Sequence, residues 1–114
     1  MSDIARNIIA LREEILANVR IVAVSKLKSA DDILKAYNAG QKIFGENRVQ
    51  ELFKKYNSLP RDIEWHFIGH LQSNKVRRIA SFVNMIHSVG TFRLLKVIDQ
   101  EAARADRVID CLLQ

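Results

Sequence analysis

The sequence predicts an α/β fold in which five parallel strands alternate with five helices. Short apolar runs rich in β-branched residues recur along the 114 residues, and segments with apolar residues at helical spacing separate them. Such alternation gives right-handed crossovers and a parallel sheet. The length suits one domain, so we expect residues 1–114 to form a single unit. No dinucleotide fingerprint or Walker loop follows a strand, and the pattern fits an open doubly wound sheet and part of a (β/α) barrel about equally.

The N-terminal third predicts a helix, a strand and a second helix. Residues 2–18 carry apolar side chains at helical spacing, namely Ile4, Ile8, Leu11 and Ile15. The run "IVAVSK" at 21–26 is apolar and β-branched, which is typical of a buried strand. Ser29 is the expected cap of the next helix, with Asp32 at the capping-box position, and Gly40 ends it. Its predicted buried face consists of Ile33, Leu34 and Tyr37.

The middle third continues the alternation. "KIFGEN" at 42–47 is the second predicted strand, and "RVQELFKKY" at 48–56 is the helix after it. The expected buried face of that helix is Val49, Leu52, Phe53 and Tyr56. Pro60 breaks the chain before a third strand, "IEWHFIG" at 63–69. Ser73 is then expected to cap a helix that buries Val76, Ile79, Ala80 and Val83.

The last third predicts two strands around one helix. "MIHSV" at 85–89 is the fourth strand, and Gly90 with Thr91 opens a helix that buries Leu94, Leu95, Ile98 and Ala102. "RVIDCLLQ" at 107–114 is the fifth strand, whose Val108, Ile109, Leu112 and Leu113 lack a following neighbour. Unpaired strand edges are templates for association. This strand is therefore a true edge, part of a longer fold, or the contact of a homo-oligomer.

Composition and charge exclude several classes of protein. The chain is 48% hydrophobic and 27% charged, close to the average of soluble domains, and we expect no membrane association and no signal peptide. The single Cys111 cannot form an internal disulfide, which favours a reducing, cytoplasmic location. The formal charge of +5 is spread among acidic residues, and the densest basic group, Lys75-Val-Arg-Arg78, has no aromatic neighbours. We therefore do not expect nucleic-acid binding.

Lys26 is the first candidate functional residue, because it follows an apolar run. Strand alternation puts it on the same face as Val22 and Val24, at the carboxyl end of the strand, where α/β folds bind ligands. An amine shielded by such apolar neighbours is more readily neutral and nucleophilic, as a Schiff-base lysine must be. The alternative is a lysine whose stem packs at the strand exit while its charge stays in water, and the local pattern alone favours this alternative.

Asn47 is the second candidate, at the end of the next strand and hence at the same rim. Its side chain offers a donor and an acceptor to a ring substituent, although Asn47 is also a good N-cap for the helix that follows. His66, His70 and His87 have no cysteine or carboxylate at ligand spacing, so we expect no metal site. The donor-rich loop "GHLQSNK" is either an anion site or an ordinary capped loop.

Three blocks, "VAVSK", "AGQKIFGENRVQE" and "WHFIGHLQSNK", resemble the pyridoxal-phosphate homeostasis proteins in their order and spacing. These proteins are single-domain relatives of the N-terminal barrel domain of alanine racemase. The resemblance implies a pyridoxal 5'-phosphate (PLP) binding TIM barrel with a Schiff base on Lys26 and with Asn47 near the cofactor. It runs from the first helix to the last residue, although the link before the first strand is shorter here than in the family.

The resemblance covers only the N-terminal portion of the family, five strands of an eight-stranded barrel. The loops that bring Ser, Gly and Arg residues to the cofactor phosphate belong to the last three strands, which this chain lacks. We therefore expect a truncated PLP-binding barrel domain with a role in PLP homeostasis rather than an enzyme. The alternatives are a racemase-like enzyme, which needs a second acid or base, and a half-barrel that binds no ligand and self-associates.

Overall fold

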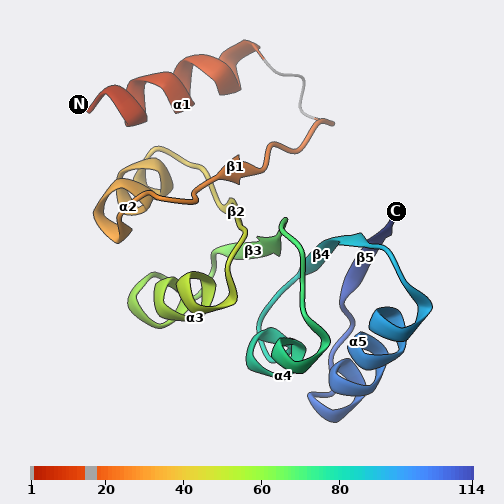
Figure 1. The fold of residues 1–114 in the computed structure, drawn as a ribbon. Helices are drawn as coiled ribbons and strands as arrows, with labels where there is room; N and C mark the ends of the chain where they lie inside the picture. Colours follow the sequence, from red (N-terminus) through yellow and green to blue (C-terminus); the bar gives the residue numbers. More distant parts are fainter. Residues whose placement is uncertain (1, 15–17) are drawn as a thin grey trace.

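Five strands form one parallel sheet in the computed structural model, which describes residues 2–14 and 18–114 (Figure 1). The strands are β1 (Ala23–Val24), β2 (Ile43–Glu46), β3 (Glu64–Phe67), β4 (Met85–Val89) and β5 (Asp110–Leu113). They follow one another in sequence order, β1-β2-β3-β4-β5, and each neighbouring pair is parallel. A doubly wound sheet reverses its strand order, whereas a (β/α) barrel does not. The predicted five parallel strands are confirmed, and their order is that of a barrel.

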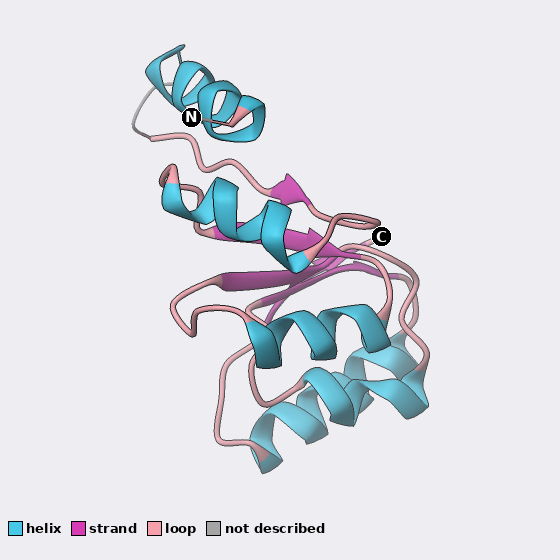
Figure 2. Ribbon diagram, turned by 90° about the vertical axis from the view of Figure 1, so that its left-hand side faces the viewer, coloured by secondary structure: helices cyan, strands magenta, loops and turns pink. Residues whose placement is uncertain are grey.

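The helices follow the sheet along its outer side (Figures 1 and 2). They are α1 (Asp3–Glu14), α2 (Ala30–Asn38), α3 (Val49–Ser58), α4 (Val76–Ile79) and α5 (Phe92–Arg104), and the 3₁₀ turn η1 (Ser73–Lys75) precedes α4. Right-handed crossovers between sequential strands place their helices on one face, which explains this arrangement. No helix within residues 2–14 and 18–114 is long and apolar enough to cross a membrane.

The hydrophobic core lies between the sheet and the helices. Its fully buried members from the strands are Phe44, Trp65, Phe67 and Ile86, and those from the helices include Leu52, Val76 and Ile79. The Phe44 and Trp65 rings lie 5.9 Å apart in a tilted arrangement. Alternate residues of each strand face this layer, so the next residue along each strand points to the opposite face of the sheet.

Strand β1 is shorter than the predicted strand at 21–26, and the Gln41 side chain adds to its pairing with β2. The register pairs Ala23 with Phe44 and Val24 with Gly45, and the Ser25 amide donates to the Gly45 carbonyl at 2.9 Å. Gln41 is 1% exposed, and its amide nitrogen donates to the carbonyls of Ile21 and Ile43, both at 2.7 Å. These two bonds hold the start of β1 against β2 where the ladder itself does not extend.

In helices α1, α2 and α3, fewer of the predicted face residues are buried than expected. Helix α1 has no buried residue among those described, and Leu11 is 42% exposed. Residues 15–17, which include Ile15 of the predicted stripe, lie outside the described residues. Leu34 and Phe53 are 37% and 40% exposed, which corrects their assignment to buried faces. The two helices bury other residues instead: α2 buries Ala36 and α3 buries Lys55, and neither was predicted to lie in the core.

The helix predicted to begin at Ser73 is replaced by the turn η1 and the single turn α4. The Ser73 cap is wrong, because Gln72 precedes η1 and no side chain caps it. The core prediction is right, since Val76, Ile79, Ala80 and Val83 are all buried. Arg107 explains the early end of α4: its guanidinium donates to the carbonyls of Ala80 and Val83, at 2.8 and 2.7 Å, in place of further helical bonds.

The caps predicted at both ends of α2 and at the start of α5 are confirmed. The Ser29 hydroxyl accepts from the Asp32 amide, and the Thr91 hydroxyl accepts from the Leu94 amide, both at 3.1 Å. Gly40 follows α2 with a φ of +107°, a backbone conformation that favours glycine. Strand β5 and the segment before it leave apolar side chains in solvent, since Val108, Leu112 and Leu113 are 87%, 48% and 72% exposed.

The contrast between Leu52 and Leu34 provides a test of this core. We expect Leu52→Ala to lower the free energy of unfolding by about 2–5 kcal/mol, because it leaves a cavity in a site with no solvent access. The same substitution at Leu34 should cost less than about 1 kcal/mol. Urea denaturation followed by circular dichroism measures both, and equal losses would contradict the assigned core.

Candidate functional site

Lys26 and Asn47 meet at the carboxyl edge of the sheet. Lys26 follows the end of β1 and Asn47 follows the last residue of β2, so parallel pairing of the two strands brings them to the same rim. Both residues line one open cavity of about 530 Å³, which Lys28, Arg48 and Glu51 also line. This volume is in the range of small-molecule sites.

A tight turn presents Lys26. The Lys28 amide donates to the Ser25 carbonyl at 3.1 Å, so Lys26 and Leu27 occupy the two central positions of the turn. Leu27 has a φ of +63°, which is uncommon for a residue with a β-carbon, and its side chain is 91% exposed. A strained backbone at such a place is held by its surroundings.

The face on which Lys26 lies is only partly as predicted. Ser25 is 3% exposed and faces the helices, so alternation leaves Lys26 on the opposite face with Val24, as the strand pattern indicated. That face is open, however, because Val24 is 54% exposed and Lys26 itself is exposed. The described residues therefore do not shield the amine, which corrects the expectation of an apolar setting around it.

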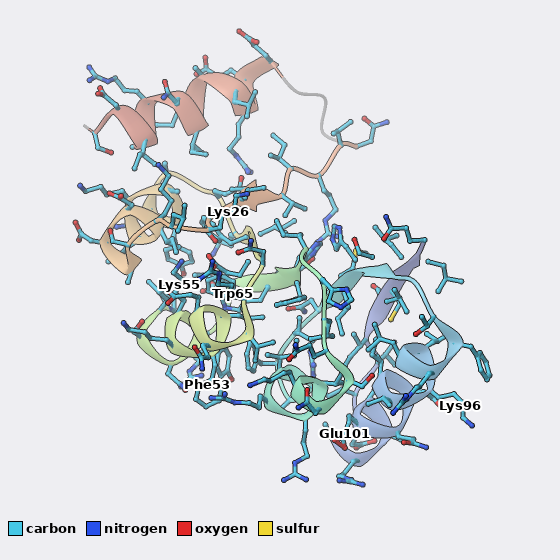
Figure 3. All side chains as sticks on the ribbon, viewed as in Figure 1. Lys26, Phe53, Lys55, Trp65, Lys96 and Glu101 are labelled. Carbon is cyan, nitrogen blue, oxygen red and sulfur yellow. The ribbon has the colours of Figure 1, made fainter. Side chains whose placement is uncertain are left out.

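A buried polar network lies directly behind this turn. The Lys55 ammonium of α3 donates to the Ser25 carbonyl at 3.0 Å and to Oε2 of Glu46 at 2.9 Å (Lys26 and Lys55 are labelled in Figure 3). The Ser25 hydroxyl is hydrogen-bonded to the same Glu46 oxygen and lies 3.2 Å from the Gly45 carbonyl oxygen. The side chains of Lys55 and Glu46 are 6% and 1% exposed, so this is a buried ion pair.

Asn47 is held by a close backbone approach rather than by helix capping. Arg48 is the N-cap of α3, and no side chain caps that helix, so the N-cap assigned to Asn47 is wrong. Gly69, which follows β3, lies so close that a β-carbon added to it would be 2.6 Å from the Asn47 carbonyl oxygen and 2.9 Å from its β-carbon. The Asn47 side chain is therefore not committed to α3.

Four polar side chains form a hydrogen-bonded chain across the strands. Both oxygens of Glu64 accept from the Arg20 guanidinium at 2.6 Å, and Oε2 of Glu64 lies 2.8 Å from Nε2 of His66. Nδ1 of His66 lies 3.1 Å from Nε2 of His87. Burial opposes ionisation of Glu64, but the hydrogen bonds from His66 and Arg20 outweigh it and lower the pKa of this carboxyl. Burial, and then the charge of His66, lower the pKa of His87.

The structure thus brings His66 and His87, for which the sequence predicted no contact, within hydrogen-bond distance. His66 and His87 lie on neighbouring strands whose register pairs His66 with Met85. Within residues 2–14 and 18–114, no group of three or more His, Cys, Asp or Glu side chains could hold a metal ion. His70 instead lines cavities at the rim of the sheet.

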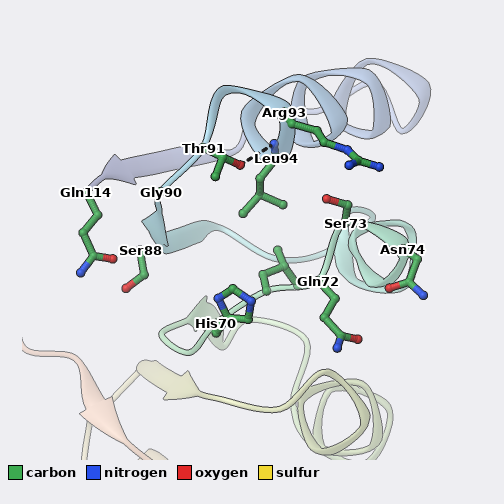
Figure 4. A pocket seen from close by; sticks show the side chains of 11 residues that line it. His70, Gln72, Ser73, Asn74, Ser88, Gly90, Thr91, Arg93, Leu94 and Gln114 are labelled. Atoms are coloured by element: carbon green, nitrogen blue, oxygen red, sulfur yellow. Dashed lines mark hydrogen bonds between the residues drawn. The ribbon is translucent and has the colours of Figure 1, made fainter.

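The "GHLQSNK" loop borders a second open cavity of about 630 Å³ at the same edge of the sheet (Figure 4). Polar residues that line it include His70, Gln72, Ser73, Asn74, Ser88, Thr91 and Arg93. The Thr91 hydroxyl is already used as the α5 cap, as the dashed line in Figure 4 shows. Anion binding by this loop stays a prediction.

Sequence reasoning missed Ser25, Glu46 and Lys55 as parts of the site. Two signals pointed to them. Lys55 stands three residues after Leu52, on the apolar face of its helix, and Glu46 ends an otherwise apolar strand. A lysine and a glutamate in such positions are buried only when they are paired.

The contact between Gly69 and Asn47 generates a prediction. We expect Gly69→Ala to displace Asn47 and to lower the free energy of unfolding by about 1–3 kcal/mol, because the added methyl group meets backbone atoms. Gly90→Ala is the matched control, since its added β-carbon would meet nothing within 4 Å. Urea denaturation and the Asn47 side-chain amide resonances report both effects. Unchanged Asn47 resonances in Gly69→Ala would contradict this contact.

Comparison with known proteins gives consistent matches over most of the chain. No family model matches. A pyridoxal phosphate homeostasis protein of Schizosaccharomyces pombe is 45% identical over 84 residues, which are 72% of this chain and 35% of the relative. The protein of the same name from Escherichia coli K12 is 38% identical over 118 residues, 90% of this chain and 50% of the relative. The chain therefore spans half or less of the length of these relatives.

The solved structures agree with the sequence matches. PipY of Synechococcus elongatus PCC7942, solved without PLP, superposes with a TM-score of 0.89 at 40% identity and covers 96% of this chain. The match covers 52% of PipY. PipY with PLP bound superposes with a TM-score of 0.88. In sequence and in fold, the chain corresponds to a portion of the pyridoxal phosphate homeostasis proteins, about half of their length or less.

Proposed function

We propose that this chain contributes the amine-bearing part of a PLP site and serves in PLP homeostasis, with Lys26 as the Schiff-base lysine. The observation that carries the proposal is the cavity at the sheet edge that Lys26 and Asn47 both line. The relatives are named pyridoxal phosphate homeostasis proteins, and PipY was solved with PLP bound. These names and that structure support the proposal.

The residues around the cavity fit the chemistry of PLP. The cofactor supplies an aldehyde that condenses with a primary amine and a ring that acts as an electron sink. Lys26 offers an exposed amine, and none of the described carboxylates lies within ion-pair distance of it. Asn47 offers a donor and an acceptor to a ring substituent. Lys26, Lys28 and Arg48 line the cavity against Glu51 and against Glu46, whose charge Lys55 balances, and this excess of positive charge favours an anionic ligand.

A carrier role fits the described residues better than a racemase-like activity. Racemisation needs an acid or base on each side of the cofactor ring, and Lys26 supplies one. The two tyrosines of the chain are used elsewhere: the Tyr37 hydroxyl donates to Asp62 at 2.6 Å, and the Tyr56 ring stacks on Phe82 at 3.9 Å. We therefore propose PLP holding and release, in the cytoplasm, without turnover of an amino acid.

Titration with PLP tests the role of Lys26. We expect the wild-type chain to develop the visible absorbance of a Schiff base, and Lys26→Ala to remain without it, because the amine that forms the C=N bond is gone. Lys96→Ala is the control and should behave as wild type, because Lys96 lies on helix α5, far from Lys26 in Figure 3, and does not line the cavity. Equal absorbance in Lys26→Ala, or none in the wild type at saturating PLP, would contradict the proposal.

The exposed edge strand favours a second property, self-association. We propose that the chain forms a dimer or larger assembly through open strand edges, because among the described residues β5 pairs with β4 alone and leaves Leu112 and Leu113 in solvent. Sedimentation equilibrium should give a mass above the 13.1 kDa of one chain. Leu112→Lys with Leu113→Lys should shift the chain toward the monomer. A monomeric wild type at all concentrations would contradict the proposal.

A further inference from the structure

The buried ion pair between Lys55 and Glu46 has no part in the proposed chemistry, and core packing does not explain it. Two charges taken out of water are often replaced without loss by apolar side chains of similar volume. Here both side chains are nearly inaccessible, at 6% and 1% exposed, and they lie against the strand ends that carry the cavity. A buried charged pair at such a position indicates a role in the site.

The pair is joined to the turn that carries Lys26. The Lys55 ammonium and the Lys28 amide both donate to the Ser25 carbonyl, at 3.0 and 3.1 Å. This carbonyl closes the turn in which Lys26 and the strained Leu27, with its φ of +63°, are the central residues. A left-handed residue other than glycine persists only where neighbouring contacts fix the backbone. At the base of this turn the Ser25 amide donates to the Gly45 carbonyl at 2.9 Å, and the ammonium of Lys55 is the buried side-chain contact on the Ser25 carbonyl.

The same pair is joined to Asn47. Glu46 immediately precedes Asn47, and its carboxylate accepts from both Lys55 and the Ser25 hydroxyl. The Glu46 carbonyl also accepts from the Ile68 amide at 2.8 Å, next to the glycine that packs on Asn47. The other carboxylate oxygen of Glu46 is buried and has no hydrogen-bond partner among the described residues, and Glu46 itself lines the cavity.

We infer that Lys55 and Glu46 are positioning residues that set the direction in which Lys26 enters the cavity. They act through the Ser25 carbonyl and hydroxyl, which connect α3 and β2 to the turn after β1. This inference rests on the proposed PLP role of Lys26, and it extends that role to a pair of residues that need not touch the cofactor. Without the ion pair the turn after β1 is less constrained, so the Lys26 amine also points in directions from which it cannot reach the PLP aldehyde.

Two measurements on Lys55→Met and Glu46→Gln test the inference. The first is the rate of Schiff-base formation with PLP, which we expect to fall by roughly tenfold or more in both variants. The second needs no PLP: competitive acetylation, read by mass spectrometry, gives the reactivity of Lys26 relative to Lys96, and we expect this ratio to change. Circular dichroism establishes that each variant is folded.

Lys42→Met is the matched control. Lys42 forms an ion pair with Asp62 at 2.6 Å, but this pair is exposed and lies at the start of β2, the opposite edge of the sheet. Its removal should leave both the Schiff-base rate and the acetylation ratio of Lys26 at the wild-type values. A change in this control as large as that in Lys55→Met would show a general effect of charge and overturn the inference.

The outcomes separate this inference from the proposed function. Folded Lys55→Met and Glu46→Gln with wild-type rates and wild-type acetylation overturn it. If the wild type forms no Schiff base, the PLP proposal fails, and the acetylation ratio still decides whether the pair positions Lys26. If both variants fail to fold, Ser25→Ala replaces them, because it removes one hydrogen bond to Glu46 and leaves the ion pair in place. A slower Schiff-base rate in Ser25→Ala supports the inference, and a wild-type rate overturns it.

Discussion

The geometry of the candidate site depends on the ion pair between Lys55 and Glu46. Burial of two charges costs several kcal/mol per ion unless hydrogen bonds offset it. Here the Ser25 carbonyl and hydroxyl supply those bonds, so helix α3 and the ends of β1 and β2 are joined at one point. Lys26 directly follows Ser25, and Asn47 directly follows Glu46. The junction therefore fixes where both residues lie. The contacts that stabilise this part of the fold thus also position the amine of Lys26.

The order of elements could be predicted because it is a local property of the chain. Apolar periodicity changes between that of strands and that of helices, and the caps at Ser29, Gly40 and Thr91 depend only on nearby residues. The choice between a doubly wound sheet and a barrel could not be made from periodicity, since it lies in the order of strands. The helix predicted to begin at Ser73 was wrong in its cap, since no side chain caps η1, and in its length, since Arg107 binds the carbonyls of Ala80 and Val83 beyond α4 through a tertiary contact.

The candidate site could be located from the sequence, although its surroundings could not. The blocks around Lys26 and Asn47 identified the family and the edge of the sheet, and parallel pairing then brings the two residues to one rim. The exposure of Lys26 agrees with the alternative that the local pattern favoured, a lysine whose charge stays in water, whereas the exposure of Val24 beside it could not be predicted, because it depends on what covers the inner face of the sheet. Lys55 was missed because helical spacing alone does not distinguish a buried lysine from one whose stem merely lies on apolar surface.

We propose that Lys26, held by this junction, is the amine of the chain that captures PLP. Reduction of the PLP-treated protein with borohydride converts a C=N bond into a stable secondary amine, and peptide mapping then shows which lysine carries the pyridoxyl group. We expect the label to be concentrated on the peptide that contains Lys26. A label spread evenly over Lys26, Lys28, Lys54 and Lys96 would contradict it, since this would mean that the fold selects no lysine.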